Sequence, residues 1–146
     1  FTNPDGSVGV IIPAPNCKLS LAEIQAKDVP AGSANVRQIT TDDLPANRAY
    51  RGAWDDSNPE SNVGVNAAKD GEIAHGGRRD QRKTLLTPLD EEQNFVSVNT
   101  SRKTAIKDEK LAILAANAAH QDVIGVAVAA GDVAAIEAAE VAVGTL

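Results

Sequence analysis

The chain has 146 residues, a net charge of −6 and an aromatic content of only 3%. This length corresponds to one domain, or to one small domain with an extension. The acidic balance argues against affinity for nucleic acid or anionic lipid through bulk positive charge, so we expect neither partner. Alanine supplies 25 residues, whereas Val, Ile, Leu, Phe, Trp and Tyr together supply 36. Because small side chains bury little apolar area each, we expect a thin core and burial against other subunits.

Several kinds of site are also disfavoured. Cys17 is the only cysteine, so an internal disulfide and a cysteine-based zinc set are both absent. The two histidines, His75 and His120, are far apart in the sequence. No apolar run approaches the roughly 18 residues of a membrane span, and the first residues lack the pattern of a signal peptide. We therefore expect no metal, no cofactor and no membrane span.

The first third of the chain predicts two strands and a short helix. Residues 7–12 are rich in β-branched side chains, which favours a strand. Residues 19–27 predict a helix, with Ser20 as its N-cap and Glu23 at the capping-box position. Residues 36–40 alternate between apolar and polar side chains, which predicts a second, half-buried strand.

We interpret residues 1–56 as a small β-rich N-terminal unit that ends in an aromatic segment. This segment holds the only tyrosine and the only tryptophan, Tyr50 and Trp54, beside Arg48 and Arg51. An arginine over an aromatic ring gains about 0.5–2 kcal/mol. Two roles are open for the four side chains, because a lone Trp anchors either a core or an interface with a partner. We take the second role for this docking segment and predict Arg48, Tyr50, Arg51 and Trp54 as partner-binding residues.

Residues 57–65 are polar and rich in turn formers, which predicts a connector or a short hairpin. Residues 66–146 then form a predicted helical region. Good helix formers run from 67 to 89, but glycines weaken this stretch by about 1 kcal/mol each. We expect a break near Gly76 and a kink or an end at Pro88.

The remaining residues are Ala-rich and predict two more helices. Residues 101–119 carry an apolar stripe, and the helix continues to Ala130 before Gly131 as C-cap and Asp132 as the next N-cap. The last helix places three apolar side chains on one face, which we take as further partner-binding residues: Val133, Ile136 and Val143. The predicted fold class is α+β, with a small N-terminal β-rich unit followed by a mainly α-helical, Ala-rich C-terminal region.

Three other groups of residues carry weaker signals. A basic cluster over residues 75–83, which includes Arg78, suggests a phosphate contact, but nine basic and eight acidic residues over 69–110 favour a solvated helix face. Cys17 needs a nearby base to act as a nucleophile. The Asp pairs at 42–43 and 55–56 have cation-binding oxygens, but adjacent Asp residues in turns are more often caps. We therefore predict no catalytic residue and no metal site.

A resemblance to a known family rests on the order of several motifs. Residues 3–15 read NPDGSVGVIIPAP, residues 21–32 read LAEIQAKDVPAG, and then come Asp43-Leu44-Pro45, Arg48, Tyr50-Arg51 and Ala53-Trp54. This order resembles small tail-associated proteins of tailed bacteriophages and prophages. The match is looser over 66–82, where the glycines at 71, 76 and 77 depart from the basic helix of that family.

The resemblance implies a non-enzymatic structural or accessory component of a phage particle, with no catalytic residue to carry over. We expect it to be tail-associated, located in the virion after a stage in the host cytoplasm, and to dock on other phage virion proteins and on copies of itself as a homo-oligomer. An alternative is a tail or fibre assembly chaperone that is absent from the mature particle. A third possibility is a small hydrolase that uses Cys17 or an Asp pair.

Overall fold

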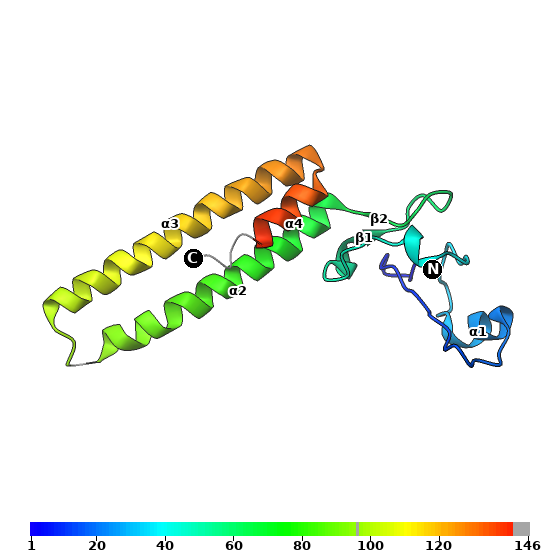
Figure 1. Ribbon diagram of the computed structural model, residues 1–146, viewed down its shortest axis with the longest axis horizontal. Helices are drawn as coiled ribbons and strands as arrows, with labels where there is room; N and C mark the ends of the chain where they lie inside the picture. The colour runs from blue at the N-terminus through cyan, green and yellow to red at the C-terminus, as the bar shows by residue number, and fades with distance from the viewer. Residues whose placement is uncertain (96, 142–146) are drawn as a thin grey trace. The chain divides into compact units, whose positions relative to one another are not determined.

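The computed structural model of the chain describes residues 1–95 and 97–141. It divides into two compact units, Phe1–Asn66 and Ala67–Leu146. Over the described residues, four α-helices and one antiparallel pair of short strands make up the regular structure, together with two short 3-10 turns (Figure 1). The fold is therefore α+β and mainly helical, as the sequence predicts at this coarse level.

The first unit contains one helix and one small hairpin. Helix α1 (Leu21–Asp28) begins at the predicted capping box: the Ser20 hydroxyl accepts from the Glu23 backbone N–H, and the Glu23 carboxylate accepts from the Ser20 N–H at 2.8 Å. Strands β1 (Trp54–Asp55) and β2 (Gly64–Val65) pair in antiparallel register, with Trp54 opposite Val65. Residues 57–65 are thus part of a short hairpin inside this unit.

The prediction of a β-rich N-terminal unit is wrong in its extent. Neither residues 7–12 nor residues 36–40 form a strand, and the structure gives only isolated bridges from Thr2 to Val8 and from Thr2 to Ala34. The physical reason is that Thr2 lies between the two segments and pairs with both. Directly after the bridge to Ala34, Asn35 adopts a positive φ of 50°, which is not an extended conformation and ends the ladder before residues 36–40.

The second unit is a helical hairpin with a third helix against it. Helices α2 (Ala67–Asn94) and α3 (Thr100–Ala130) pack side by side, and α4 (Val133–Val141) packs against both (Figure 1). The predicted break and restart is confirmed. Gly131 has a φ of 69° and ends α3, and the Asp132 carboxylate accepts from the Ala135 N–H at 3.0 Å at the start of α4.

Helix α2 is continuous, so the predicted break near Gly76 is wrong, and of the two alternatives at Pro88 the end of the helix is excluded. A kink at Pro88 stays a prediction. Gly71 is buried beneath Val128 of α3. The packing of α3 on α2 at this residue outweighs the low helix propensity of glycine. A Cβ atom on Gly71 would lie 2.3 Å from Cγ2 of Val128, so only glycine permits this approach. The glycine that weakens an isolated helix therefore brings two helices together.

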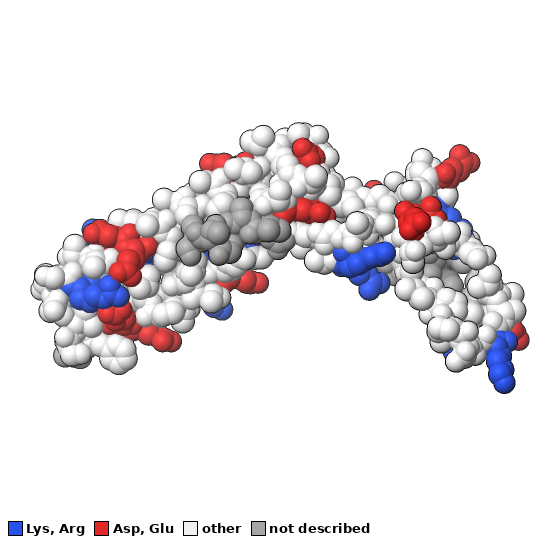
Figure 2. All heavy atoms as spheres, in the orientation of Figure 1, with Lys and Arg blue, Asp and Glu red and all other residues white. Residues whose placement is uncertain are grey.

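Charged side chains join α2 and α3 at the tip of the hairpin, beyond Pro88 (Figure 2). The Arg102 guanidinium donates to both oxygens of Glu92 at 2.6 Å and to Glu109 at 2.6 Å, and the Lys110 ammonium lies 2.6 Å from Asp90. The bidentate bond to Arg102 lowers the pKa of Glu92. We call the four side chains that pair across the two helices, Asp90, Glu92, Arg102 and Lys110, the tip clasp. It holds the end of α2 in place after proline removes a helix hydrogen bond.

Substitutions of two α2 glycines are expected to act in opposite directions. Gly71→Ala places a methyl group against Val128, whose χ1 is stiff in a helix, and should lower the free energy of unfolding by about 1–3 kcal/mol. Gly76→Ala meets no atom within 4 Å and should raise it by about 0.5–1 kcal/mol. Urea unfolding followed by circular dichroism measures both. Equal effects at the two positions would contradict the close approach at Gly71.

Loss of the tip clasp is expected to loosen the end of α2. Arg102→Ala leaves Glu92 without its bidentate partner, and the backbone amides of residues 89–94 should exchange with solvent about threefold faster or more. Lys103→Ala is the matched control, because Lys103 is an exposed neighbour outside the clasp. Hydrogen exchange that is unchanged in Arg102→Ala would show that the clasp does not support this segment.

Candidate functional site

The aromatic segment turns its two rings inward. Tyr50 is 3% exposed and Trp54 is 2% exposed, whereas Arg48 and Arg51 are exposed. The guanidinium carbons of Arg48 and Arg51 lie 5.2 and 5.5 Å from the centroid of the Trp54 ring. Tyr50 and Trp54 are therefore part of the core of the first unit. This corrects the prediction that they contact a partner. Only Arg48 and Arg51 remain accessible in the predicted docking segment.

The predicted docking face of the last helix also contains residues that are buried within the chain. Ile136 is fully buried, because α4 packs against α2 and α3, and Val133 is half-buried. Ile136 therefore serves the core of its own chain, which corrects its assignment to a partner. Val143 lies outside the described residues.

An exposed apolar surface is found instead on α3. The sequence groups Leu111 and Leu114 with Ile106 in one stripe, but Ile106 is fully buried whereas Leu111 and Leu114 are 54% and 43% exposed. We define the α3 outer face by its four large exposed side chains: Leu111, Leu114, Val123 and Val126. From residue 111 to the end of α3, Asp122 is the one charged residue in the sequence. The apolar surface is therefore wide and almost uncharged.

Helix α3 is also long and apolar enough to cross a membrane by length and composition alone. Only 17% of its most apolar stretch is buried within the structure. This low burial reflects the same exposed side chains that define the α3 outer face. One such helix is weak evidence for a span, and α3 is paired with the strongly charged α2, a partner that would be costly to bring into lipid.

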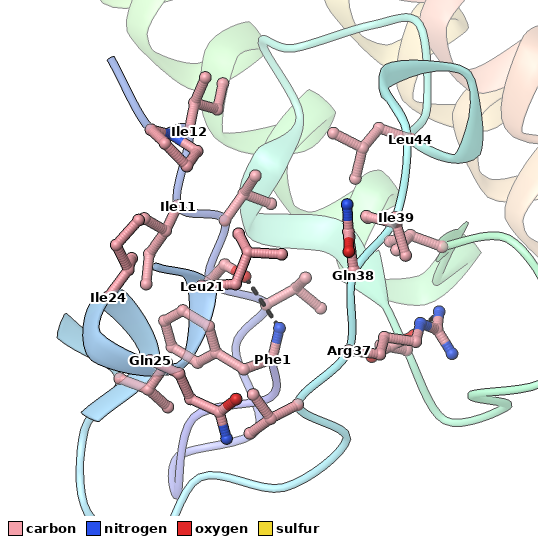
Figure 3. Close-up of a pocket in the computed structure, with 18 of the residues that line it drawn as sticks. Phe1, Ile11, Ile12, Leu21, Ile24, Gln25, Arg37, Gln38, Ile39 and Leu44 are labelled. Carbon is pink, nitrogen blue, oxygen red and sulfur yellow. Dashed lines mark hydrogen bonds and ion pairs between the residues drawn. The ribbon is translucent and has the colours of Figure 1, made fainter. Parts of the chain in front are cut away.

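The first unit contains a groove between two extended segments (Figure 3). Residues 10–12 form one wall and residues 36–39 form the other, and Leu21 and Ile24 of α1 add apolar side chains to the lining. The volume is about 520 Å³. We call this feature the N-terminal groove. The two walls belong to the segments 7–12 and 36–40, which were predicted as strands but do not form strands, and the groove is the space between them.

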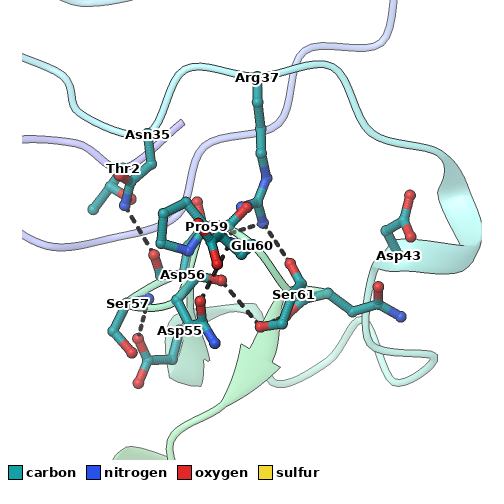
Figure 4. Close-up of polar contacts among 12 residues, drawn as sticks. Thr2, Asn35, Arg37, Asp43, Asp55, Asp56, Ser57, Pro59, Glu60 and Ser61 are labelled. Carbon is teal, nitrogen blue, oxygen red and sulfur yellow. Dashed lines mark hydrogen bonds and ion pairs between the residues drawn. The ribbon is translucent and has the colours of Figure 1, made fainter.

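A polar network fastens one wall of this groove to the loop of the hairpin (Figure 4). The Arg37 guanidinium donates to the buried Asp56 carboxylate, to the Ser61 carbonyl at 3.0 Å and to the Pro59 carbonyl. The Asn35 amide donates to the Asp56 carbonyl at 2.9 Å. Arg37 and Asp56 carry the charged side chains of the lining, and they neutralise each other.

Two charged side chains of α2 are buried in the second unit, one turn on either side of Ala74. Arg78 is 1% exposed and donates to the Ala139 carbonyl in the last turn of α4, where a cation is favoured. This corrects the prediction that the whole basic cluster is a solvated face. Asp70 is fully buried, and neither carboxylate oxygen has a hydrogen-bond partner among the described residues. Burial and the negative charge of Glu137 raise the pKa of Asp70 to about 6.

The groups with conventional chemistry do not assemble into a site over the described part of the chain. Cys17 is an exposed free thiol in the first unit, and no group of three or more His, Cys, Asp and Glu residues that could hold a metal occurs among the described residues. No protein-family model, curated protein or solved structure matches the chain. The two surfaces that stand out are therefore the α3 outer face and the N-terminal groove.

The buried Asp70 is expected to make stability depend on pH. Because its pKa is raised in the folded state, the chain loses stability as the pH rises from about 4 to above 6 and the carboxyl ionises. Asp70→Asn should therefore raise the free energy of unfolding by about 1–2 kcal/mol at pH 7.5, after allowance for solvent screening, with little change at pH 4. Urea unfolding at the two pH values measures this. An equal gain at both values would exclude ionisation of Asp70 as the cause.

Proposed function

We propose that the chain is a non-enzymatic docking protein, a structural or accessory component of the tail of a phage particle. The observation that carries the docking role is the α3 outer face, where large apolar side chains remain exposed on a helix whose opposite face is already packed. Several large apolar side chains exposed on one helix are typical of protein–protein contacts. The resemblance of residues 3–54 to phage tail-associated proteins supports the location.

The dimensions of α3 suit a contact with a neighbouring subunit. A helix of 31 residues is about 46 Å long at 1.5 Å per residue, which is long enough to present a standard interface of about 800 Å² per partner. Alanines between the larger residues permit close packing of a second helix. Copies of this chain in a closed ring, or a different virion protein, are the partners that this surface fits.

The experiment is mass spectrometry of density-purified particles from an infection that produces this chain, with its peptide signal normalised to the major tail protein. A fixed stoichiometric ratio is expected. Absence from the particles together with presence in the lysate would contradict the structural role and favour the assembly chaperone.

A matched pair of variants tests the surface itself. Val126→Glu adds a charge at the most exposed position of the α3 outer face, and it should lower incorporation into particles about tenfold or more because a buried unpaired charge is costly. Gln81→Glu adds the same charge at an exposed position of α2 and should leave incorporation unchanged. Equal incorporation of the two variants would show that the α3 outer face is not the docking surface. Circular dichroism of both proteins controls for folding.

A further inference from the structure

The four large side chains of the α3 outer face are placed symmetrically along the helix. Leu111 and Val126 are equally far in sequence from the midpoint of residues 118–119, which are both alanine. The same is true of Leu114 and Val123. The order of large and small exposed side chains is therefore the same when the helix is followed from either end. A surface of this kind is complementary to a second copy of itself across a two-fold axis.

The same symmetry holds around the helix axis. Successive residues of an α-helix are turned by about 100°, since there are 3.6 residues per turn. We take as the midline of the outer face the direction halfway between residues 118 and 119. Leu111 and Val126 then lie about 30° on either side of this midline, and Leu114 and Val123 lie about 90° on either side. The first pair therefore occupies the centre of the face and the second pair its two edges.

The midline of the outer face points away from the rest of the second unit. The fully buried residues Ile106 and Ile124 lie about 170° from it around the helix. Helices α2 and α4 contact α3 on that buried side (Figure 1). A second helix can therefore approach the α3 outer face without displacing either neighbour.

Asp122 determines the direction that a second copy of α3 would take. It is exposed and lies about 10° from the midline. A parallel arrangement brings the two Asp122 carboxylates to the same level, where like charges repel. An antiparallel arrangement separates them by seven residues, or about 10 Å along the axis. Each carboxylate then lies at the level of Ala115, whose small side chain leaves room for water.

We propose that the α3 outer face binds a second copy of this chain, with the two α3 helices antiparallel about a two-fold axis between Ala118 and Ala119. Leu111 of each chain packs beside Val126 of the second copy, and the alanines at the axis permit close approach. The inference rests on the proposed docking role and names the partner at this surface. Because residues 111–130 span only about 30 Å, we expect a dissociation constant of about 1–100 µM.

The first test measures the mass of the whole chain by sedimentation equilibrium, at concentrations from about 1 to 300 µM. The mass should rise from that of one chain to that of two. Ala118→Glu places two like charges beside the axis and should weaken the dimer about tenfold or more. Gln81→Glu adds the same charge at an exposed position of α2 and should leave the dimer unchanged. Circular dichroism controls for folding.

A further variant removes the charge from the middle of the contact. Asp122→Ala takes away a carboxylate that the dimer partly removes from water, so it should tighten the dimer about threefold or more. The substitution also favours the helix, because alanine has a higher helix propensity than aspartate. A gain in dimer affinity is a result that general damage to the fold would not give.

Disulfide cross-linking tests the direction of the two helices, in chains that also carry Cys17→Ser. A mixture of Leu111→Cys and Val126→Cys chains should form a disulfide between the two kinds of chain on oxidation, because the antiparallel dimer sets these residues side by side. Either variant alone should not cross-link. In this arrangement two copies of the same residue lie 15 residues apart, or about 22 Å along the axis.

Four results would overturn the proposal. If Leu111→Cys chains cross-link to each other, the helices are parallel. If Ala118→Glu leaves the dimer intact, or Asp122→Ala weakens it, the chains meet through another surface. If the chain stays monomeric but Val126→Glu still lowers incorporation into particles, the docking role holds with a different partner. If it stays monomeric and Val126→Glu is incorporated normally, the proposed docking surface fails as well.

Discussion

The chain has few large apolar side chains from which to build a core, and each unit compensates for this shortage in its own way. In the second unit, Gly71 of α2 leaves room for the Val128 side chain of α3, and the tip clasp holds the other end of the hairpin. In the first unit, Arg37 and Asn35 fasten separate segments through hydrogen bonds to the hairpin loop. Close approach and charge-assisted hydrogen bonds thus replace much of the area that larger side chains would bury.

The shortage also determines which residues remain for a partner. Trp54 and Ile136 are drawn into the interior because few other large side chains exist to fill it. Conversely, α3 is so apolar from residue 111 onward that packing on α2 and α4 leaves exposed apolar side chains on this part of the helix. The aromatic and isoleucine side chains that the sequence singles out, Trp54 and Ile136, are therefore part of the interior, and the exposed surface of α3 consists of ordinary leucine, valine and alanine side chains.

The sequence predicts the structure correctly where a few neighbouring residues determine the outcome. The Ser20–Glu23 capping box and the Gly131–Asp132 boundary are of this kind, since each depends on hydrogen bonds within one turn. Where the outcome depends on residues far apart in the sequence, the local pattern predicts it wrongly. Gly76 and Pro88 weaken an isolated helix, but the packing of α2 against α3 keeps α2 continuous through both residues. The β-branched residues at 7–12 favour a strand, but their pairing in the described chain is an isolated bridge from Val8 to Thr2. Burial of Arg78 depends on α4, which lies some sixty residues further along the chain.

The position of the single tryptophan gives each unit its own optical signal. Trp54 belongs to the first unit, whereas most of the helix lies in the second, where α2 has 28 residues and α3 has 31 against eight in α1. Intrinsic fluorescence therefore reports the first unit, and far-ultraviolet circular dichroism reports chiefly the second. Denaturation curves from the two methods that coincide would make the whole chain one cooperative unit, and curves that separate would make it two.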